Sequence, residues 1–273
     1  MTTDQVPLQA EPRASPQGFD PAYFDSLVDA EDNHFWFAVR NRVIASVLRR
    51  LVRNKQPGYH VLEIGCGAGN VLRVLESTCV GGQVMGVELF EEGARRARTR
   101  VDCPVVTGDI DAMSFEHRFD LIGMFDVLEH IEDDVATLRH VTELLAPGGR
   151  VLVTVPADPR LWSSFDVASH HHRLYTKESL VRSFRAAGFE LEYLTPFMVL
   201  LHPLMRLRRS APEAGDVDGS AVVDAEFRIN RYVNVIAHAL MLPESWWVRR
   251  GWRLPVGTSL LAVARRTGTL RHS

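Results

Sequence analysis

The chain has 273 residues, of which 46% are hydrophobic and 24% charged, and its formal net charge is -3. This composition is enough to bury a full core and predicts one ordinary globular domain with additions. The net charge and the short, scattered arginine clusters argue against nucleic-acid binding, because proteins that bind a phosphate backbone usually present a strongly basic face.

Cysteine usage and the N-terminal sequence indicate in which cellular compartment the protein is located. The three cysteines are an odd number without metal-type spacing, which suits a reducing environment. Residues 1–18 are polar and contain proline, so we expect a disordered tail and no signal peptide. No apolar run reaches the roughly 18 residues that span a bilayer. Together these features predict a cytoplasmic protein without stable membrane insertion.

Residues 19–57 are predicted to form an N-terminal helical cap. An aromatic and arginine-rich opening, His34-Phe-Trp-Phe-Ala-Val-Arg40, begins an amphipathic helix whose apolar residues recur at helical spacing as far as Leu51. Most of these apolar side chains are expected to pack against a sheet.

The first predicted strand follows and ends in the glycine loop Gly65-Cys-Gly67-Ala-Gly69, with Glu63 just before it. Glycines let the main chain approach a ligand closely. Dinucleotide-binding loops read G-x-G-x-x-G, whereas this loop reads G-x-G-x-G and has Asn70 at the third glycine position. The Glu63 carboxylate would repel a phosphate and suits an ammonium group. The loop therefore favours S-adenosylmethionine (SAM) and disfavours a nicotinamide-dependent dehydrogenase.

Strands and helices are predicted to alternate from about Tyr59 to Val155, with the clearest helices over Glu91 to Arg100 and Asp133 to Leu145. This alternation predicts parallel strands joined by right-handed crossovers. Ligands of such sheets bind beyond the carboxyl ends of the strands. We therefore expect one crevice to collect the acids that end four of the strands: Glu63, Glu88, Asp109 and Asp126.

In this order, the segments resemble class I SAM-dependent methyltransferases, in the branch that acts on small molecules. The matching segments are Glu63-x-Gly65-x-Gly67-x-Gly69, the strand-end acids Glu88 and Asp109, Asp126-Val-Leu-Glu-His-Ile131, and the turn Pro147-Gly-Gly149 into the fifth strand. The resemblance runs from His34 to Arg265. It implies SAM as methyl donor and S-adenosylhomocysteine as product.

The resemblance also implies roles for single residues. Glu88 would accept hydrogen bonds from the ribose hydroxyls, and Asp109 would accept one from the adenine amino group beside the main-chain amide of Ile110. Cys66 is expected to be a small filler of the loop. The complete expected set of cofactor residues is Glu63, Gly65, Cys66, Gly67, Gly69, Glu88, Leu89, Asp109, Ile110, Phe125 and Asp126.

Methyl transfer needs few catalytic groups, because the donor is already activated and the enzyme mainly aligns the acceptor and excludes water. A hydroxyl acceptor would be helped by a histidine base, for which His130 and His171 are the candidates. His171 lies in the run His170-His-His172, and it falls on the usual histidine of the family branch, although His170 and Leu174 depart from its pattern. Consecutive histidines in an extended chain point to opposite faces, so we predict no metal site.

Three residues are expected to bind the substrate: Trp36, Arg40 and Tyr175. By resemblance, the N-terminal helix would cover the SAM pocket and Arg40 would face a carboxylate of cofactor or substrate. Tyr175 belongs to the segment after the fifth strand that begins near Trp162 and resembles the same branch.

The C-terminal third is predicted to complete the sheet. A helix after Thr176 should stop at Gly188, which has the character of a C-cap. Phe189 to Leu194 and Gly257 to Ala264 would by resemblance form an antiparallel hairpin. The expected fold class is α/β: a Rossmann-like, seven-stranded, mostly parallel sheet with the last strand antiparallel and helices on both faces. Its parts are the SAM-binding domain 58–195, a helical insert 196–256, and the last strand with its tail, 257–273.

The insert 196–256 is apolar and flanked by arginines. It is interpreted as a lid over a hydrophobic substrate, a homodimer surface or a membrane-touching pair of helices; we favour a helical cap that packs on the domain and shapes the acceptor pocket. The sequence as a whole predicts a SAM-dependent methyltransferase of a small molecule, with oxygen favoured over nitrogen as acceptor. The alternative is a non-catalytic SAM-binding protein with a regulatory or scaffold role.

Overall fold

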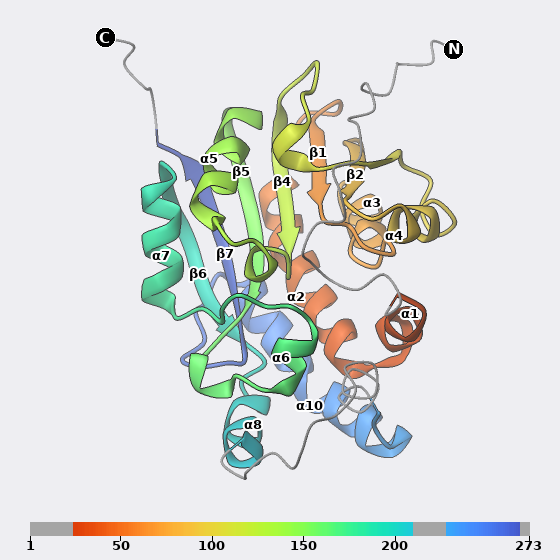
Figure 1. Cartoon of the computed structure of the whole chain (residues 1–273), viewed down its shortest axis with the longest axis vertical. Helices are drawn as coiled ribbons and strands as arrows, with labels where there is room; N and C mark the ends of the chain where they lie inside the picture. The colour runs from red at the N-terminus through yellow and green to blue at the C-terminus, as the bar shows by residue number, and fades with distance from the viewer. Residues whose placement is uncertain (1–23, 210–227, 268–273) are drawn as a thin grey trace.

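A seven-stranded sheet forms the centre of the molecule in a computed structural model that describes residues 24–209 and 228–267 (Figure 1). The expected tail of residues 1–18 lies outside these ranges. The strands are β1 (His60–Ile64), β2 (Gln83–Glu88), β3 (Val105–Thr107), β4 (Phe119–Phe125), β5 (Leu145–Pro156), β6 (Phe189–Phe197) and β7 (Ser259–Arg266). Their order in the sheet is β3-β2-β1-β4-β5-β7-β6.

The strand directions confirm the predicted fold class. β1 to β5 pair in parallel, and β7 runs antiparallel between β5 and β6. The strand order reverses between β1 and β4, which places the switch point of the sheet at their carboxyl ends. The carboxyl ends of β1, β4 and β5 point toward the end of the molecule where α1 and α6 lie (Figure 1).

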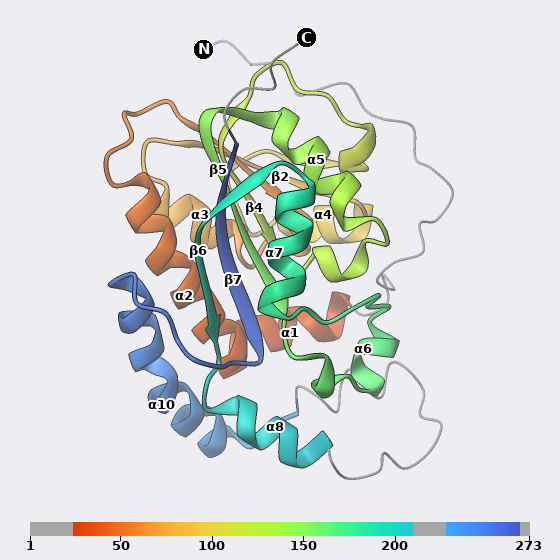
Figure 2. The same cartoon turned by 90° about the vertical axis from the view of Figure 1, so that its left-hand side faces the viewer.

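Helices cover both faces of the sheet, as the sequence predicted. The described helices are α1 (Phe24–Asn33), α2 (Phe35–Val52), α3 (Leu72–Thr78), α4 (Glu91–Ala97), α5 (Asp134–Leu144), α6 (Ser164–Ala168), α7 (Lys177–Ala186), α8 (Leu201–Arg209) and α10 (Arg231–Arg249), with the short 3-10 turns η2 (Ile110–Ala112), η3 (Leu128–His130) and η4 (Pro159–Leu161). Figure 2 shows α2 and α10 on one side of the sheet and α5 and α7 on the other.

Local sequence explains where the helices on the second side begin and end. Asp133 caps α5 by accepting a hydrogen bond from the amide of Ala136, and Thr176 caps α7 through a reciprocal pair of hydrogen bonds with Ser179. Gly188 follows α7 with a φ of +85°, a left-handed conformation that suits the predicted C-cap.

The core is built on both faces of the strands. In β1, Val61 packs in the cluster under α2 and α10, whereas its neighbour Leu62 packs in the cluster under α5 and α7. Successive strand residues point to opposite faces, so a sheet covered on both sides needs nearly continuous apolar strands. This explains why the strands read as apolar runs rather than as alternating patterns.

β7 runs over Ser259–Arg266 rather than the predicted Gly257 to Ala264, and two other strands also differ from the sequence-based prediction. β5 begins at Leu145, so the predicted turn Pro147–Gly149 lies inside the strand, at an irregularity in its pairing with β4. β6 extends to Phe197, three residues beyond the predicted end, because its pairing with β7 continues to the start of the insert. None of these changes moves the ends of β1 to β4 where the acids were predicted.

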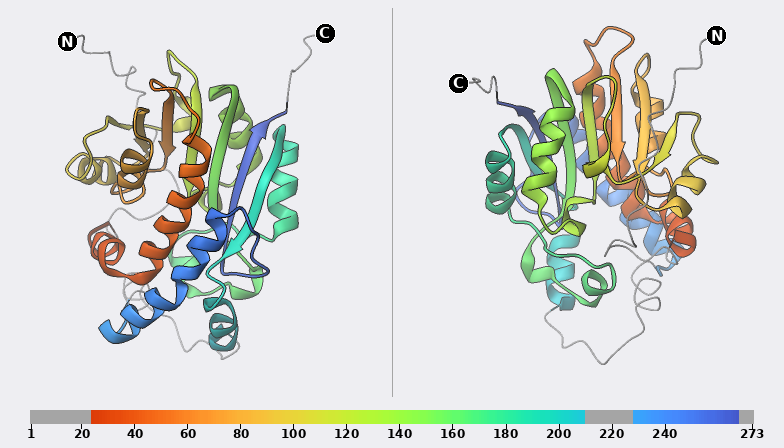
Figure 3. Two further views of the ribbon diagram at one scale, coloured as in Figure 1. Left: turned by 180° about the vertical axis from the view of Figure 1, so that it is seen from behind. Right: turned by 45° about the horizontal axis from the view of Figure 1, so that its top comes forward.

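The insert contributes α8 and α10, and α10 lies along α2 (Figure 3). The amide of Phe35 donates to Oδ1 of Asn234 at 2.8 Å, and Nδ2 of Asn234 donates to the carbonyl of Asn33 at 2.8 Å. Met241 and Val248 of α10 are buried in the same cluster as the apolar face of α2. The N-terminal cap and the insert are therefore joined, although they are far apart in sequence.

None of the described helices is both long enough and apolar enough to cross a bilayer.

Candidate active site

A cleft of about 370 Å³ opens at the carboxyl ends of β1 to β4. Segments following all four strands line it, and residues of α1, α2 and the region after β5 cover it. Most of the residues singled out from the sequence meet here. Those that line the cleft are Trp36, Arg40, Gly65, Glu88, Leu89, Asp109, Ile110, Phe125, Asp126, His130 and His171.

The glycine loop presents bare main chain at the end of β1. Gly67 has a φ of +54°, and a Cβ atom placed on it would meet nothing within 4 Å. At Gly65 a Cβ would lie 2.6 Å from Val127, so this glycine allows close packing against the segment after β4. Cys66, Gly67 and Gly69 do not line the cleft, and Cys66 is buried beside Leu72 in the core.

Glu88 joins the glycine loop to the end of β2. One of its carboxylate oxygens accepts from the amide of Gly67 at 2.7 Å, and the other accepts from the amide of Phe90 at 3.0 Å. Burial raises the pKa of Glu88, and these amide hydrogen bonds oppose that rise. Each oxygen keeps a lone pair for a further donor. The geometry fits a carboxylate that accepts from two ribose hydroxyls.

Asp109 and Ile110 line the cleft at the end of β3. The Asp109 side chain caps η2, with Oδ1 accepting from the amide of Asp111 at 3.0 Å. This cap fixes the carboxylate at the strand end and leaves its second oxygen available. The arrangement fits the acid that was expected beside the adenine ring.

Glu63 lies behind the cleft surface rather than on it. It is buried, and its Oε2 has no hydrogen-bond partner among the described residues. Burial raises the pKa of Glu63 well above its ordinary value, and the neighbouring Arg40 guanidinium opposes the rise. A buried carboxyl oxygen without a partner is costly unless a ligand supplies one. Its presence beside the glycine loop fits a ligand that carries an ammonium group, as SAM does.

Arg40 reaches from α2 across the cleft to the end of β4. Its Nη1 donates to Asp126 at 2.7 Å and its Nη2 donates to Oδ1 of Asn70 at 3.0 Å. Asp126 has a left-handed φ of +57° and also accepts from the hydroxyl of Thr154 at 3.2 Å. The guanidinium lies about 5 Å from the ring centres of Trp36 and Phe37. Arg40 thus links the helical cap to the strand ends.

The cleft is acidic. Among its lining residues the carboxyl groups are Glu31, Glu88, Asp109, Asp111, Asp126 and Glu129, whereas Arg40 supplies the one guanidinium and no lysine takes part. Such a wall repels a pyrophosphate and favours a cationic ligand. This charge pattern agrees with the sequence argument against a dinucleotide.

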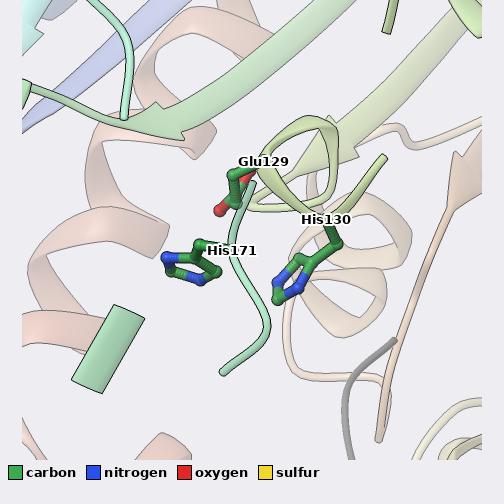
Figure 4. A group of neighbouring side chains, drawn as sticks. All are labelled: Glu129, His130 and His171. Carbon is green, nitrogen blue, oxygen red and sulfur yellow. The ribbon is translucent and has the colours of Figure 1, made fainter. Parts of the chain in front are cut away.

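Glu129, His130 and His171 lie close together among the residues that line the cleft (Figure 4). Glu129 and His130 come from η3, directly after β4, whereas His171 follows α6. The rings of the two histidines are 4.7 Å apart and nearly perpendicular. Nδ1 of His171 is 2.9 Å from Oδ1 of Asp166, and both side chains are nearly buried.

Burial determines the protonation state of His130 and affects that of Glu129. Burial lowers the pKa of His130 to about 3, with further lowering by neighbouring histidines, so this ring stays neutral at neutral pH. Burial and the nearby Asp126 raise the pKa of Glu129 well above its ordinary value. One donor atom from each of Glu129, His130 and His171 lies within 4.8 Å of the other two, a spacing that a metal ion can bridge. The sequence had predicted no metal here.

Tyr175 corrects the predicted substrate-binding set. Its side chain is only 1% exposed, and its hydroxyl donates to Oδ2 of Asp134 at 2.8 Å and lies 3.3 Å from the carbonyl of Leu128. It belongs to the core under α5 and α7 and does not line the cleft. The residue ties the start of α5 to the segment after β5, because that segment turns the ring inward.

Three residues of the site carried little or no signal in the sequence. Glu31 lines the cleft from α1, where it looked like one of several helix-surface acids. Asp166 orients His171 and also accepts from the amide and hydroxyl of Ser163. Asn70 accepts from both Arg40 and Asn41. A polar residue in place of a third glycine was the one visible hint of this last role.

The fold and the cleft define an enzyme that binds SAM at the carboxyl ends of a Rossmann-like sheet. A sequence profile of methyltransferase domains matches residues 36–194, which is more than half of the chain. The chain belongs to the class I SAM-dependent methyltransferases. The prediction made from the ordered motifs is thereby confirmed.

Curated relatives of the chain include O-methyltransferases. It is 27% identical over 172 residues to a ubiquinone biosynthesis O-methyltransferase of Thiobacillus denitrificans, a match that covers 56% of this chain and 72% of the relative. A protein of the same description from a Bradyrhizobium species is 33% identical over 116 residues, covering 41% of this chain and 44% of the relative.

Solved structures share the fold. A TehB-like SAM-dependent methyltransferase of Corynebacterium glutamicum superposes with a TM-score of 0.52 at 17% identity, covering 91% of this chain and 100% of the other. Phosphoethanolamine N-methyltransferase 2 of Haemonchus contortus, solved with SAM, superposes with a TM-score of 0.58 at 21% identity, covering 90% of this chain and 57% of the other.

Proposed function

We propose that this methyltransferase acts on a hydroxyl group of a small, largely apolar molecule, with His171 as the general base. The observation that carries the proposal is the Asp166–His171 pair, which lies in the same cleft as the strand ends that fit the cofactor. The family establishes methyl transfer from SAM, and the hydroxyl acceptor is what we propose in addition.

Asp166 prepares His171 for proton transfer. Its Oδ1 holds Nδ1 of the imidazole at 2.9 Å, and its Oδ2 accepts from both the amide and the hydroxyl of Ser163 at 2.8 Å. A carboxylate fixed in this way selects the tautomer with the proton on Nδ1, so Nε2 is the nitrogen that can accept a proton. The same division of roles operates between aspartate and histidine in hydrolase triads.

The residues around His171 leave it as the histidine that accepts the proton from the acceptor. SAM, when bound, supplies an electrophilic methyl group. His171 would take the proton of the acceptor hydroxyl as the oxygen becomes a nucleophile. His130 has its pKa held near 3 by burial and does not compete for that proton. The role of His130 in this proposal is to form a wall of the acceptor site.

The acceptor side of the cleft is rich in apolar and aromatic side chains. Trp36 and Phe37 reach it from α2, Phe165 from α6, and Ile131 and Pro156 from the segments after β4 and β5. Such a lining excludes water and favours a ring or an apolar chain beside the reacting hydroxyl. The O-methyltransferases of ubiquinone biosynthesis among the relatives support oxygen as the acceptor atom.

A second candidate is an amine acceptor. The excess of carboxyl groups along the cleft favours a positively charged substrate as well as a positively charged cofactor. The deciding measurement is the release of S-adenosylhomocysteine with matched phenols, aliphatic alcohols and amines of similar size. We expect the phenols to be methylated fastest. Methylation of amines alone would contradict the proposal.

The same assay separates a base from a metal centre at Glu129, His130 and His171. Activity that is unchanged after treatment with EDTA supports His171 as the base. Activity that EDTA removes and a divalent cation restores would assign the three residues to a metal ion instead.

For localisation we propose a reducing compartment, the cytoplasm. The support is that Cys66, Cys79 and Cys103 are all free thiols.

A further inference from the structure

The outward face of α10 is apolar along its whole length. Its side chains recur at helical spacing and are largely exposed: Tyr232 (72%), Ile236 (58%), Leu240 (60%), Trp246 (46%) and Trp247 (41%). The opposite side of the helix packs on α2 through the buried Met241 and Val248. The helix therefore has two apolar sides, of which only one is covered by the described part of the protein. We call the exposed set the α10 face.

Aromatic and basic groups mark the C-terminal end of the α10 face. Trp246, Trp247 and Trp252 form a cluster with ring centres 4.7 to 6.2 Å apart. The guanidinium of Arg250 lies 4.0 Å from the ring centre of Trp246. Tryptophan with arginine beside it is the combination that suits a boundary between apolar and aqueous phases, because each has an apolar body and a polar end.

Basic residues outnumber acids in the insert. In residues 196–207 and 228–256, where the structure describes the side chains, the basic residues are Arg206, Arg228, Arg231, Arg249, Arg250 and Arg253. The one acid in these ranges is Glu244, which is buried and accepts from the amides of Met198 and Val199. The exposed positions of α10 between Arg231 and Arg249 carry no charged side chain.

We propose that the α10 face docks on an anionic lipid bilayer, with the helix lying flat on the membrane surface. A helix with an apolar outer face and arginines at both of its ends matches the chemistry of such a surface, since acyl chains receive the apolar groups and anionic headgroups receive the arginines. A second copy of the chain fits less well, because a symmetric dimer through this face would bring its arginines opposite one another. The docking is peripheral, in line with the lack of a spanning helix among the described residues.

The helix that carries the α10 face packs on its other side against the helices that cover the cleft. Asn234, on α10, accepts from the amide of Phe35 at 2.8 Å, and the next residue, Trp36, lines the cleft. A bilayer against α10 would therefore lie next to the covering helices of the acceptor site. This placement would suit an apolar acceptor delivered from the membrane, but the docking itself does not depend on the proposed acceptor.

The test is co-sedimentation of the full chain with vesicles of phosphatidylcholine, with and without phosphatidylglycerol. We expect binding to the anionic vesicles that weakens as salt rises. Ile236→Glu combined with Leu240→Glu should reduce this binding by about tenfold or more. Arg249→Gln should reduce it by about fivefold, and only on anionic vesicles. The matched control is Val80→Glu, at an 82% exposed apolar position between α3 and β2, which should bind as the unchanged chain does.

Retained SAM affinity establishes that each variant is folded. The vesicle assay uses no methyl acceptor, so a negative result there contradicts membrane docking and leaves the proposed O-methylation untouched. Absence of binding to either vesicle, or binding that survives the double substitution, overturns the proposal. A dimer in sedimentation velocity that the double substitution abolishes, without vesicle binding, also overturns it and assigns the face to a second copy.

Discussion

The cofactor side and the acceptor side of the cleft are built in different ways. On the cofactor side the interactions are local to neighbouring strand ends: Glu88 accepts from Phe90, two residues on, and from the loop of the adjacent strand, and Asp109 accepts from Asp111. On the acceptor side Arg40 reaches Asp126, 86 residues away. The cofactor side is thus fixed by neighbouring strand ends, whereas the acceptor side combines the local Asp166–His171 pair with a contact between α2 and the end of β4.

This difference predicts different responses to mutation. A change on the cofactor side should alter affinity for SAM with little effect on the rest of the protein, because the sheet still holds the strand ends. A change on the acceptor side should alter catalysis or stability, because each residue there holds segments together or acts on the acceptor. Four substitutions test the contrast, from the largest expected effect to the smallest.

His171→Ala should give the largest effect. Loss of a general base typically lowers turnover by about 10²–10⁴-fold. Affinity for SAM, measured by calorimetry, should remain unchanged, since His171 lies on the acceptor side of the cleft. The matched control is His172→Ala, whose exposed side chain does not line the cleft and whose amide keeps its hydrogen bond to the carbonyl of Glu129. Equal turnover of the two variants would rule out His171 as the base.

Arg40→Ala should lower stability by about 3 kcal/mol, because it leaves the carboxylate of Asp126 without its buried partner. The guanidinium also lowers the pKa values of Glu31, Glu63 and Glu129, so its removal should raise them further. Urea unfolding gives the free energy of unfolding, and Arg49→Ala on the exposed side of α2 is the control. A loss no larger than that of Arg49→Ala would show that Arg40 does not hold the cap to the strand ends.

The same contrast explains how much of the site the sequence could predict. The glycine loop, Glu88 and Asp109 were found because each lies at the end of an apolar run, so position in the sequence fixes position in the sheet. Tyr175 was misplaced because it follows β5 in an irregular segment, where no periodicity tells which way a side chain turns. Glu31 was missed because an acid on a short helix has the same pattern whether it faces solvent or a cleft.

The fold likewise has features that the sequence predicted and features that it did not. The parallel direction of the first strands and the antiparallel direction of β7 followed from the alternation of strands and helices and from the resemblance, whereas the order of the strands was not predicted. The direction of the apolar face of α10 was not predicted either, because both sides of that helix are apolar and hydrophobic periodicity gives no preferred side. Only its packing on α2 shows which residues remain outside.

Glu88→Gln should weaken SAM binding by about 1–3 kcal/mol, the range for loss of a charged hydrogen bond. One amide oxygen replaces two carboxylate oxygens that already accept from Gly67 and Phe90, so the ribose hydroxyls lose an acceptor. Calorimetry with SAM measures the change, and Glu116→Gln at the protein surface is the control. Unchanged affinity would contradict the ribose assignment, and a large loss of stability would contradict the claim that this side responds through affinity alone.

Glu63→Gln should separate stability from cofactor binding through pH. Burial raises the pKa of Glu63 in the folded protein above its ordinary value of 4.5, so folding favours the protonated acid. Its contribution to stability is fully present below about pH 4.5 and is lost as the pH rises toward the folded pKa. Relative to the variant, the free energy of unfolding of the unchanged chain should therefore fall above this pH, by at most about 1.4 kcal/mol per pH unit.

Urea titrations of both chains at a series of pH values, without SAM, measure the difference in their free energies of unfolding. Titratable groups that both chains share contribute equally and drop out of this difference. At neutral pH the variant should be the more stable protein and the weaker SAM binder, because the Glu63 oxygen that has no partner among the described residues is the one proposed to meet the ammonium group. Parallel stability curves would place the Glu63 pKa near its ordinary value. Undiminished SAM affinity would remove Glu63 from the cofactor site and leave its burial as a structural feature of β1.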